Sequence, residues 1–371
     1  MSEQVESEST DDGSPSSERP PRTAPRVERR WSSLGIGFLS QHRELTVIFG
    51  AGIAFAFFAI TTSNVGFLTI NSAGTYLESA AEIGIIAAPV TLLMIAREFD
   101  LSVGSLVGAE QILIGFVVVT LHWTLYVALV LAVGLAVLVG LLNGFLLVRT
   151  GLPSLLITLG LMFVLLGAAE GFGVLAVGNT TIGNVEQPIQ GEWIYHLFSG
   201  TPLGLPVATY WWVGVTVVAA WILDGTGLGN RVYATGGDPD AAAKCGVPVA
   251  RLKIMLFIFC SLSCIVTACC SMFVVNQANA TSGQDLVFEV VTACVIGGVT
   301  LSGGFGSPVG TLFAAFLFGV VSEGFFFTNI NEVWYEAFVG VMLLAAIVIN
   351  KYSGALTMRY WDRRQASREA T

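Results

Sequence analysis

The chain has 371 residues, of which 54% are apolar and only 12% are charged, and its mean hydropathy is +0.75. A soluble globular domain carries about 25% charged residues, so this composition excludes a protein whose whole surface faces water. The formal net charge of −9 does not identify a partner, because the distribution of charge matters more than its sum.

Residues 1–44 differ in composition from the rest of the chain. They are rich in Ser, Glu, Pro and Arg, and their first aromatic residue is Trp31. Such a segment buries too little apolar surface to offset its ordering entropy, so we expect a disordered cytoplasmic tail. Acidic residues dominate its start, which is not the pattern of a cleavable signal peptide. A regulatory role is the functional alternative to a simple solvated leader.

Ten apolar runs follow this tail. About 18 or more apolar residues are needed to cross a bilayer as a helix, and most of these runs approach or exceed that length. Carboxylates and glycines interrupt the second and the eighth run. The sequence therefore predicts an all-α polytopic membrane protein with about ten transmembrane helices, a transmembrane domain at 45–350 and a basic cytoplasmic tail at 351–371. The runs lie at about 45–62, 77–96, 102–120, 123–148, 153–177, 205–223, 253–276, 284–301, 309–328 and 333–350.

The basic residues provide an independent test of this count. Cytoplasmic loops of membrane proteins carry the excess of Lys and Arg. With the N-terminus inside and ten crossings, all 17 basic residues fall in inside segments and none falls outside. We therefore predict a multi-pass protein of the plasma (inner) membrane with both termini cytoplasmic.

The six cysteines lie between Cys245 and Cys294, and five of them are in apolar runs. Neither histidines nor further cysteines stand at the spacing of a tetrahedral metal site. Buried cysteine usually behaves as a small hydrophobic residue, so we expect these side chains to pack and to bind no metal.

The inside loop between the sixth and seventh runs contains the signals of a short helix. Asp238 is a good N-cap, Pro239 suits the first helical position, and Asp240 complements the helix dipole. Ala241–Lys244 suit the body and last turn, and Gly246 can end the helix. Because so short a helix is marginal alone in water, it suggests a protein partner. A surface helix without a partner is the alternative.

Three stretches carry motifs that occur together in one known family. Asp100–Leu106 reads D-L-S-V-G-S-L, Ile296–Gly306 contains G-G-x-x-L-x-G-G-x-G, and Gly236–Lys253 reads G-G-D-P-D-A-A-A-K-C-G-V-P-V-A-R-L-K. In this order they resemble the ribose-type (monosaccharide) ABC importer permeases, the inner-membrane components of binding-protein-dependent transport systems. The third stretch is similar to their coupling helix, with Asp238 replacing the usual Asn and Val247 replacing Ile. The resemblance covers the predicted transmembrane domain.

The resemblance implies a homo- or heterodimer of permeases on cytoplasmic ATP-binding-cassette ATPase subunits, supplied by an extracytoplasmic sugar-binding protein. ATP and Mg would then bind the partner ATPase. This chain has no G-x-x-x-x-G-K-S/T loop to cradle phosphates, so we expect it to be no enzyme and to bind no cofactor. Besides these proteins its surroundings are membrane lipid, and no nucleic acid is implied. The coupling helix is expected at about 236–247, with Gly236, Gly237, Asp238, Asp240, Ala241, Ala242, Gly246 and Val247 as the ATPase-coupling residues.

Carboxylates within the predicted spans are functional candidates, because a charge inside a membrane costs roughly 2.5–3.5 kcal/mol on insertion scales. Glu289 ranks first, since the resembling family usually has Asp at this position before its Gly-Gly pair. For each carboxylate, a hydrogen bond to a neighbouring helix is the structural alternative. The carboxylates are Glu82, Glu110, Glu170, Glu289 and Glu323, and the proposed solute-pathway residues are Glu289, Asp100, Ser102, Glu110 and Glu170.

A weak internal symmetry accompanies these motifs. Asp100–Leu101 opens one apolar run on the inside, and Asp285–Leu286 opens another on the outside. Their opposite sidedness favours an inverted repeat of five helices each. Many transporters place the substrate site where such repeats meet, often at broken helices.

The leading hypothesis is a permease subunit that translocates a monosaccharide or related polyol by alternating access, driven by a separate ATPase. The alternative is an ion-coupled secondary transporter with protons carried by the buried glutamates, which has no use for the coupling loop. An intramembrane enzyme lacks support, because His42, His122 and His196 lie outside the spans or at their edges and pair with no nucleophile.

Overall fold

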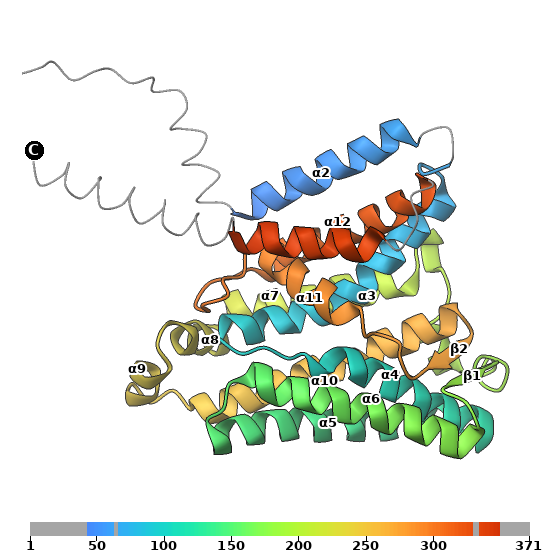
Figure 1. Ribbon diagram of the computed structural model, residues 1–371, viewed down its shortest axis with the longest axis horizontal. Helices are drawn as coiled ribbons and strands as arrows, with labels where there is room; N and C mark the ends of the chain where they lie inside the picture. The colour runs from blue at the N-terminus through green and yellow to red at the C-terminus, as the bar shows by residue number, and fades with distance from the viewer. Residues whose placement is uncertain (1–42, 63–65, 329–333, 349–371) are drawn as a thin grey trace, which may run out of the picture. The chain divides into compact units, whose positions relative to one another are not determined.

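The computed structural model describes residues 43–62, 66–328 and 334–348 (Figure 1), with side chains from Val47 onward. The chain divides into Met1–Phe38 and Leu39–Thr371, and all described residues belong to the second unit. The predicted tail at 1–44, except for its last two residues, and the predicted basic tail at 351–371 therefore lie outside the described residues.

Helices form nearly all the regular structure of the described residues, which confirms the all-α prediction. Two three-residue strands, β1 (Thr181–Gly183) and β2 (Gln277–Asn279), pair antiparallel. The helices are α2 (Arg43–Thr61), α3 (Ile70–Ile95), α4 (Ser102–Gly115) continuing into the π-helical turn η1 (Phe116–Thr120), α5 (Leu125–Thr150), α6 (Ser154–Val177), α7 (Val207–Gly225), α8 (Gly227–Gly237), α9 (Pro239–Lys244), α10 (Val249–Val274), α11 (Leu286–Ile296), α12 (Pro308–Phe327) and a last helix, Trp334–Val348.

Each of the ten predicted apolar runs overlaps one of these helices, and the largest difference is at α3, which begins seven residues before its predicted run. Seven are long and apolar enough to cross a membrane, namely α3, α4 with η1, α5, α6, α7, α10 and α12. Three apolar helices are shorter within the described residues. They are the Val47–Thr61 part of α2, α11 and Trp334–Val348. The chain is thus a polytopic membrane protein.

Helix α8 differs from the sequence prediction, which assigned its residues to a loop. Four of its eleven residues are glycine, and glycine is a poor helix former. Its buried residues Val232 and Thr235 explain the difference, because α8 packs against α7 and α3 and this tertiary contact outweighs the weak local preference. Thr226 caps the start of α8 by accepting the Leu228 N–H.

Helix α3 lies at the centre of the bundle and is the most buried candidate span. It contacts α12, α7, α10 and α11. On the other side of α10, the α5 backbone approaches closely, because Gly140 and Gly144 carry no side chain: a Cβ on either would lie within 2.7 Å of Ile258 Cα or Ile254 Cα. Small residues let transmembrane helices pack through their backbones in this way.

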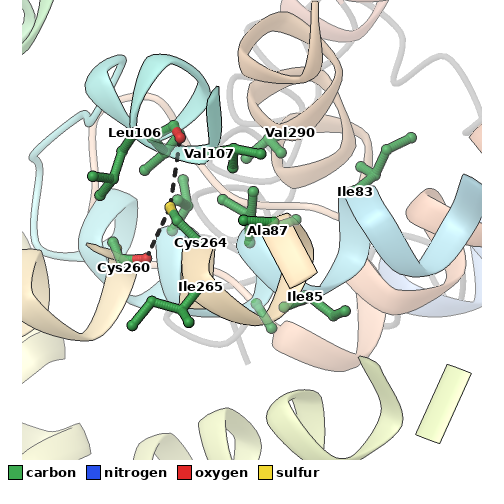
Figure 2. Packing of buried hydrophobic residues seen from close by; sticks show 14 of the residues in the cluster. Ile83, Ile85, Ala87, Leu106, Val107, Cys260, Cys264, Ile265 and Val290 are labelled. Atoms are coloured by element: carbon green, nitrogen blue, oxygen red, sulfur yellow. Dashed lines mark hydrogen bonds between the residues drawn. The ribbon is translucent and has the colours of Figure 1, made fainter. Parts of the chain in front are cut away.

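Five of the six cysteines are buried, as the sequence predicts, and Cys245 is exposed. Figure 2 shows Cys264 of α10 together with residues of α3, α4 and α11 in one apolar cluster. Its Sγ lies 3.5 Å from the Val103 carbonyl oxygen and 3.4 Å from that of Cys260. These cysteines therefore fill space between helices.

Contacts among six helices fit the predicted inverted repeat, which itself stays a prediction. Helix α3 packs most extensively against α12, and α10 packs most extensively against α5. Helix α4 contacts α10, and α11 contacts α3 in the corresponding way. If α3 is exchanged with α10, α4 with α11 and α5 with α12, each of these contacts becomes another one of the set. Helices α3 and α10 run in opposite directions, as an inverted repeat requires.

Helices α8 and α9 lie at one end of the bundle, and β1 and β2 lie at the other (Figure 1). We call these the basic end and the far end. The described basic side chains lie in α8 and α9 or near the ends of α3, α5 and α10 that reach the basic end. They are Arg97, Arg149, Arg231, Lys244, Arg251 and Lys253. The basic end corresponds to the predicted cytoplasmic side, and the orientation itself stays a prediction.

The eighth crossing is discontinuous. From β2 the chain runs along α4: a Cβ on Gly108 would lie 2.1 Å from the Ala280 oxygen, and one on Gly104 would lie 2.2 Å from the Gly283 oxygen. Helix α11 then has only 11 residues, or about 16 Å, against roughly 30 Å for the bilayer core. An extended segment and a short helix thus share the crossing that the sequence predicts as a single run at 284–301.

The close approach of residues 280–283 to the glycines of α4 predicts the effect of adding side chains to this helix. Gly108→Val should displace residue 280 and lower the free energy of unfolding by about 1–3 kcal/mol, because the contact is with rigid backbone. Thermal unfolding of the purified protein in detergent measures this loss. Gly134→Ala in α5 is the control, since its Cβ meets nothing within 4 Å. Equal midpoints for the two variants would contradict the described approach.

Candidate functional site

A cavity of about 250 Å³ lies where the extended segment turns into α11. Its wall is mostly polar and comes from four parts of the chain. Helix α3 supplies Ser79 and Glu82, the discontinuous crossing supplies Ser282, Asp285 and Glu289, α12 supplies Ser322, and the last helix supplies Tyr335. We call this the acidic cavity.

The acidic cavity lies at half the depth of the bundle. Glu82 is twelve residues from the start of α3 and thirteen from its end, which places it roughly 18 Å from either end. Helix α11 begins beside it, with Asp285 as N-cap and Glu289 in the first turn. The partial positive charge of a helix N-terminus stabilises carboxylates at these positions. A broken helix whose N-terminus faces a midplane site is typical of transporters.

Hydrogen bonds link three residues of the cavity wall. The Tyr335 hydroxyl donates to the Glu289 carboxylate and accepts from the Ser322 hydroxyl. With Glu82 and Asp285 the wall presents three carboxylates, and no Lys or Arg is among its lining residues. Carboxylate oxygens accept hydrogen bonds from hydroxyl or ammonium groups and repel anions. The cavity is therefore suited to a polyhydroxylated or cationic solute.

Glu289 is the predicted pathway residue that lines the acidic cavity. Asp100 and Ser102 instead hold the start of α4. Asp100 Oδ1 accepts the Ser102 N–H at 2.9 Å and the Ser102 hydroxyl at 2.6 Å, and Asn143 Nδ2 donates to Ser102 Oγ at 2.8 Å. These buried contacts explain why polar residues are tolerated there. A role for Asp100 and Ser102 on the solute pathway stays a prediction.

Glu110 and Glu170 also lie away from the acidic cavity. Glu110 is fully buried in α4, and neither carboxylate oxygen has a hydrogen-bond partner among the described residues. Glu170 is half-buried on α6, the least buried of the candidate spans. Their predicted pathway roles are likewise untested.

The sequence analysis named Glu82 among the functional candidates, as a carboxylate within an apolar run, but not among the solute-pathway residues. It did not assign Asp285 or Tyr335 to a site. Asp285 stood out only as the start of a repeat. Tyr335 carries no local signal, since an aromatic residue near the end of an apolar run is typical of the membrane interface.

The predicted coupling helix forms as α9, with the caps that the sequence indicates. The Asp238 side chain accepts the N–H groups of Asp240 and Ala241, both at 3.0 Å. Gly246 has φ +86°, and the chain turns there. The helix covers only Pro239–Lys244, while Gly236 and Gly237, which we expected in the same helix, end α8. Helices α8 and α9 together form what we call the coupling hairpin.

The surface of α9 is accessible. Ala242 is its one buried residue, and it anchors the helix to the bundle. The exposed positions are Asp240, Ala241, Ala243 and Lys244. Beside α9 a broad groove of about 1040 Å³ extends to the α5–α6 connection and the start of α10. A helix that presents small side chains next to a groove is suited to a protein partner.

Neither the acidic cavity nor the surface of α9 has the residues of a metal site. In the part of the chain that the structure describes, no three His, Cys, Asp or Glu residues are grouped closely enough to hold a metal ion.

Comparisons with known proteins agree on one class. Residues 72–347 match the family described as branched-chain amino acid transport system / permease component. The chain is 30% identical over 296 residues to the ribose import permease protein of Escherichia coli K12, covering 79% of this chain and 89% of that protein. It is 29% identical over 279 residues to the fructose import permease protein of Rhizobium meliloti, covering 74% and 76%.

A third relative is named for a different solute. The autoinducer 2 import system permease protein of Shigella flexneri is 28% identical over 324 residues, covering 84% of this chain and 88% of that protein. No solved structure matches the chain.

The capping of α9 makes a testable prediction. Asp238→Ala removes the acceptor for two N–H groups and should weaken α9 by about 1 kcal/mol. The amides of Asp240 and Ala241 should then exchange with deuterium about fivefold faster in mass spectrometry. Asp224→Ala, at an exposed position in α7, is the matched control. Unchanged exchange in the Asp238 variant would show that the cap does not hold α9.

Proposed function

The chain belongs to the permease family of ABC importers, and from this premise we propose that it imports a monosaccharide or related polyol. Transport would proceed by alternating access, driven by a separate ATPase that binds ATP and Mg. The acidic cavity at half-depth is the observation that carries this proposal. The relatives named for ribose, fructose and autoinducer 2 support a small, hydroxylated solute.

The acidic cavity would bind the solute through its hydroxyl groups. The Glu82, Asp285 and Glu289 carboxylates are acceptors, and the serine and tyrosine hydroxyls both donate and accept. The family description names branched-chain amino acids, but the carboxylate group of an amino acid would meet three acidic side chains. Charge therefore favours a neutral polyol over an amino acid in this member of the family.

The coupling hairpin would be the docking site of the ATPase. Its exposed small residues leave room for a partner surface, and its caps keep α9 rigid. Coupling requires that the ATPase bind two states of the permease with different affinity. A rigid helix that moves as one body is able to transmit such a difference. The proposed coupling residues remain Gly236, Gly237, Asp238, Asp240, Ala241, Ala242, Gly246 and Val247.

A second permease subunit and a sugar-binding protein complete the proposed assembly. Gly160, Gly167 and Gly171 of α6 face no atom of this chain within 4 Å. Helix α6 thus offers a face of small residues to a second copy or a related permease within the membrane. The binding protein would dock at the far end, and the basic end with both termini would be cytoplasmic.

The ion-coupled secondary transporter remains the rival function, and reconstitution separates the two. Proteoliposomes are prepared with the permease and its ATPase, and the binding protein is added outside. They should take up radiolabelled ribose or fructose only when ATP is enclosed in the lumen, on the side of the ATPase. Uptake by the permease alone, driven by an imposed proton gradient, would favour the rival.

Removing the charge of Glu289 tests the acidic cavity. A hydrogen bond to a charged group contributes about 1.5–3 kcal/mol, so Glu289→Gln should lower ribose or fructose uptake by about 10- to 100-fold. Glu110→Gln is the control, because this glutamate is buried away from the cavity. A larger loss in the Glu110 variant would move the pathway to the interface of α4 and α10.

Adding a large charged side chain to α9 tests the docking site. Ala241→Arg should abolish most co-purification with the ATPase and most uptake, because a docking surface of small residues has no room for the guanidinium. Thermal stability should stay near that of the wild type, since Ala241 is exposed. Gln190→Arg adds the same group to an exposed position between α6 and α7 and should co-purify normally. Normal co-purification of both variants would exclude α9 from the interface.

A further inference from the structure

The end of α3 adopts a backbone conformation that its residue does not favour. Arg97 has φ +69°, directly after the helix C-cap, at a position where glycine is the usual residue. The Arg97 and Glu98 N–H groups donate to the carbonyls of Met94 and Leu93, which closes the turn. An arginine in this left-handed region is strained. Such strain at a specific residue points to a use for its side chain.

The Arg97 guanidinium connects two other segments of the chain. Nε donates to the Ser302 carbonyl at 2.7 Å, and Nη2 donates to the Gly237 carbonyl at 2.7 Å. Gly237 is the last residue of α8, where the carbonyl groups of a helix attract a cation. Ser302 lies in the glycine-rich loop at 297–307, between α11 and α12.

Glu98, the next residue, binds α10, the helix that follows the coupling hairpin. Its carboxylate forms an ion pair with the Lys253 ammonium group in α10. The two side chains are only 9% and 16% exposed, so water screens this pair less than a surface pair. Lys253 follows α9 by nine residues. Two consecutive residues just after α3 thus contact the chain before and after α9.

Backbone contacts make the same junction rigid. A Cβ on Gly236 would lie 1.8 Å from the Ile95 oxygen, and the Gly304 N–H donates to that oxygen at 2.8 Å. The end of α3, the end of α8 and the glycine-rich loop therefore touch without intervening side chains. Small movements of one segment must displace the others, because close-packed groups do not compress.

We propose that Arg97 and Glu98 are positioning residues that transmit movement of the coupling hairpin to the acidic cavity. This inference rests on the proposed function. One route runs along α3, which ends two residues before Arg97 and carries Glu82 near its midpoint. The other runs through Ser302 into α11 and α12, which carry Glu289 and Ser322. Both routes start from the guanidinium, and both end in the wall of the acidic cavity.

Arg97→Gly is the sharpest test, because it removes the guanidinium and relieves the strained backbone together. In the reconstituted complex of permease, ATPase and binding protein, ribose transported per ATP hydrolysed should fall about fivefold or more. Fructose replaces ribose where the wild type does not transport ribose. Co-purification with the ATPase and basal ATP hydrolysis should persist, and the unfolding midpoint should equal or exceed that of the wild type.

Two outcomes of this test would overturn the role of Arg97. One is an unchanged ratio of solute to ATP in Arg97→Gly, and the other is failure of this variant to assemble, which would make the residue a structural requirement. Arg149→Gln, which removes an exposed cation from the last turn of α5, is the control and should keep the wild-type ratio. A wild type without ATP-dependent uptake would refute the proposed function instead, before any variant is compared.

Charge reversal tests Glu98 separately. Lys253→Glu places two carboxylates together and should lower the transported solute per ATP about fivefold or more. The double variant Glu98→Lys with Lys253→Glu restores an opposite-charge pair and should recover most of the ratio. A double variant as impaired as the single one would overturn the role of this pair.

Discussion

The structure depends on the requirement that every backbone polar group within the bilayer be satisfied by protein. Residues between β2 and α11 run extended into the bundle, and they meet this requirement through neighbouring segments. The Ala280 N–H donates to the Thr180 carbonyl, and the Gln111 side chain accepts the Asn279 N–H at 3.0 Å. Glycines in α4 admit the segment because they leave its surface without side chains. An extended chain is thereby kept away from lipid, and α11 begins at half-depth.

The acidic cavity is a consequence of this discontinuous crossing. If residues 284–301 formed one continuous helix, Asp285 would lie at the edge of the membrane and Glu289 one turn below it. The extended segment instead carries both to the level of Glu82, where α12 and the last helix complete the wall. Three carboxylates near one another are costly in an apolar surrounding. The hydrogen bond from Tyr335 to Glu289 and the partial positive charge at the N-terminus of α11 offset part of this cost.

The same crossing joins the cavity to the basic end. Helix α11 leads into the glycine-rich loop, which touches both the end of α3 and the end of α8. Helix α3 is buried along most of its length and packs against four helices, so it is suited to move as a rigid body. The coupling hairpin therefore meets two elements that both reach the cavity. In this arrangement a partner at the basic end is able to act on a solute site roughly 20 Å away without touching it.

The sequence by itself determined the features that arise locally. Apolar runs identified a helix in each predicted span, basic residues separated the two ends, and Asp238, Pro239 and Gly246 set the limits of α9. Hydropathy, caps and turns depend on residues that are neighbours in the chain, so the sequence alone is enough to predict them. Tertiary structure alone decided that α8 is a helix, that α11 is short, and that Glu82, Glu289 and Tyr335 share one cavity. These outcomes depend on packing between residues distant in sequence: glycines in α4 make room for residues 280–283, and Arg97 meets Gly237 and Ser302 only after the helices have assembled.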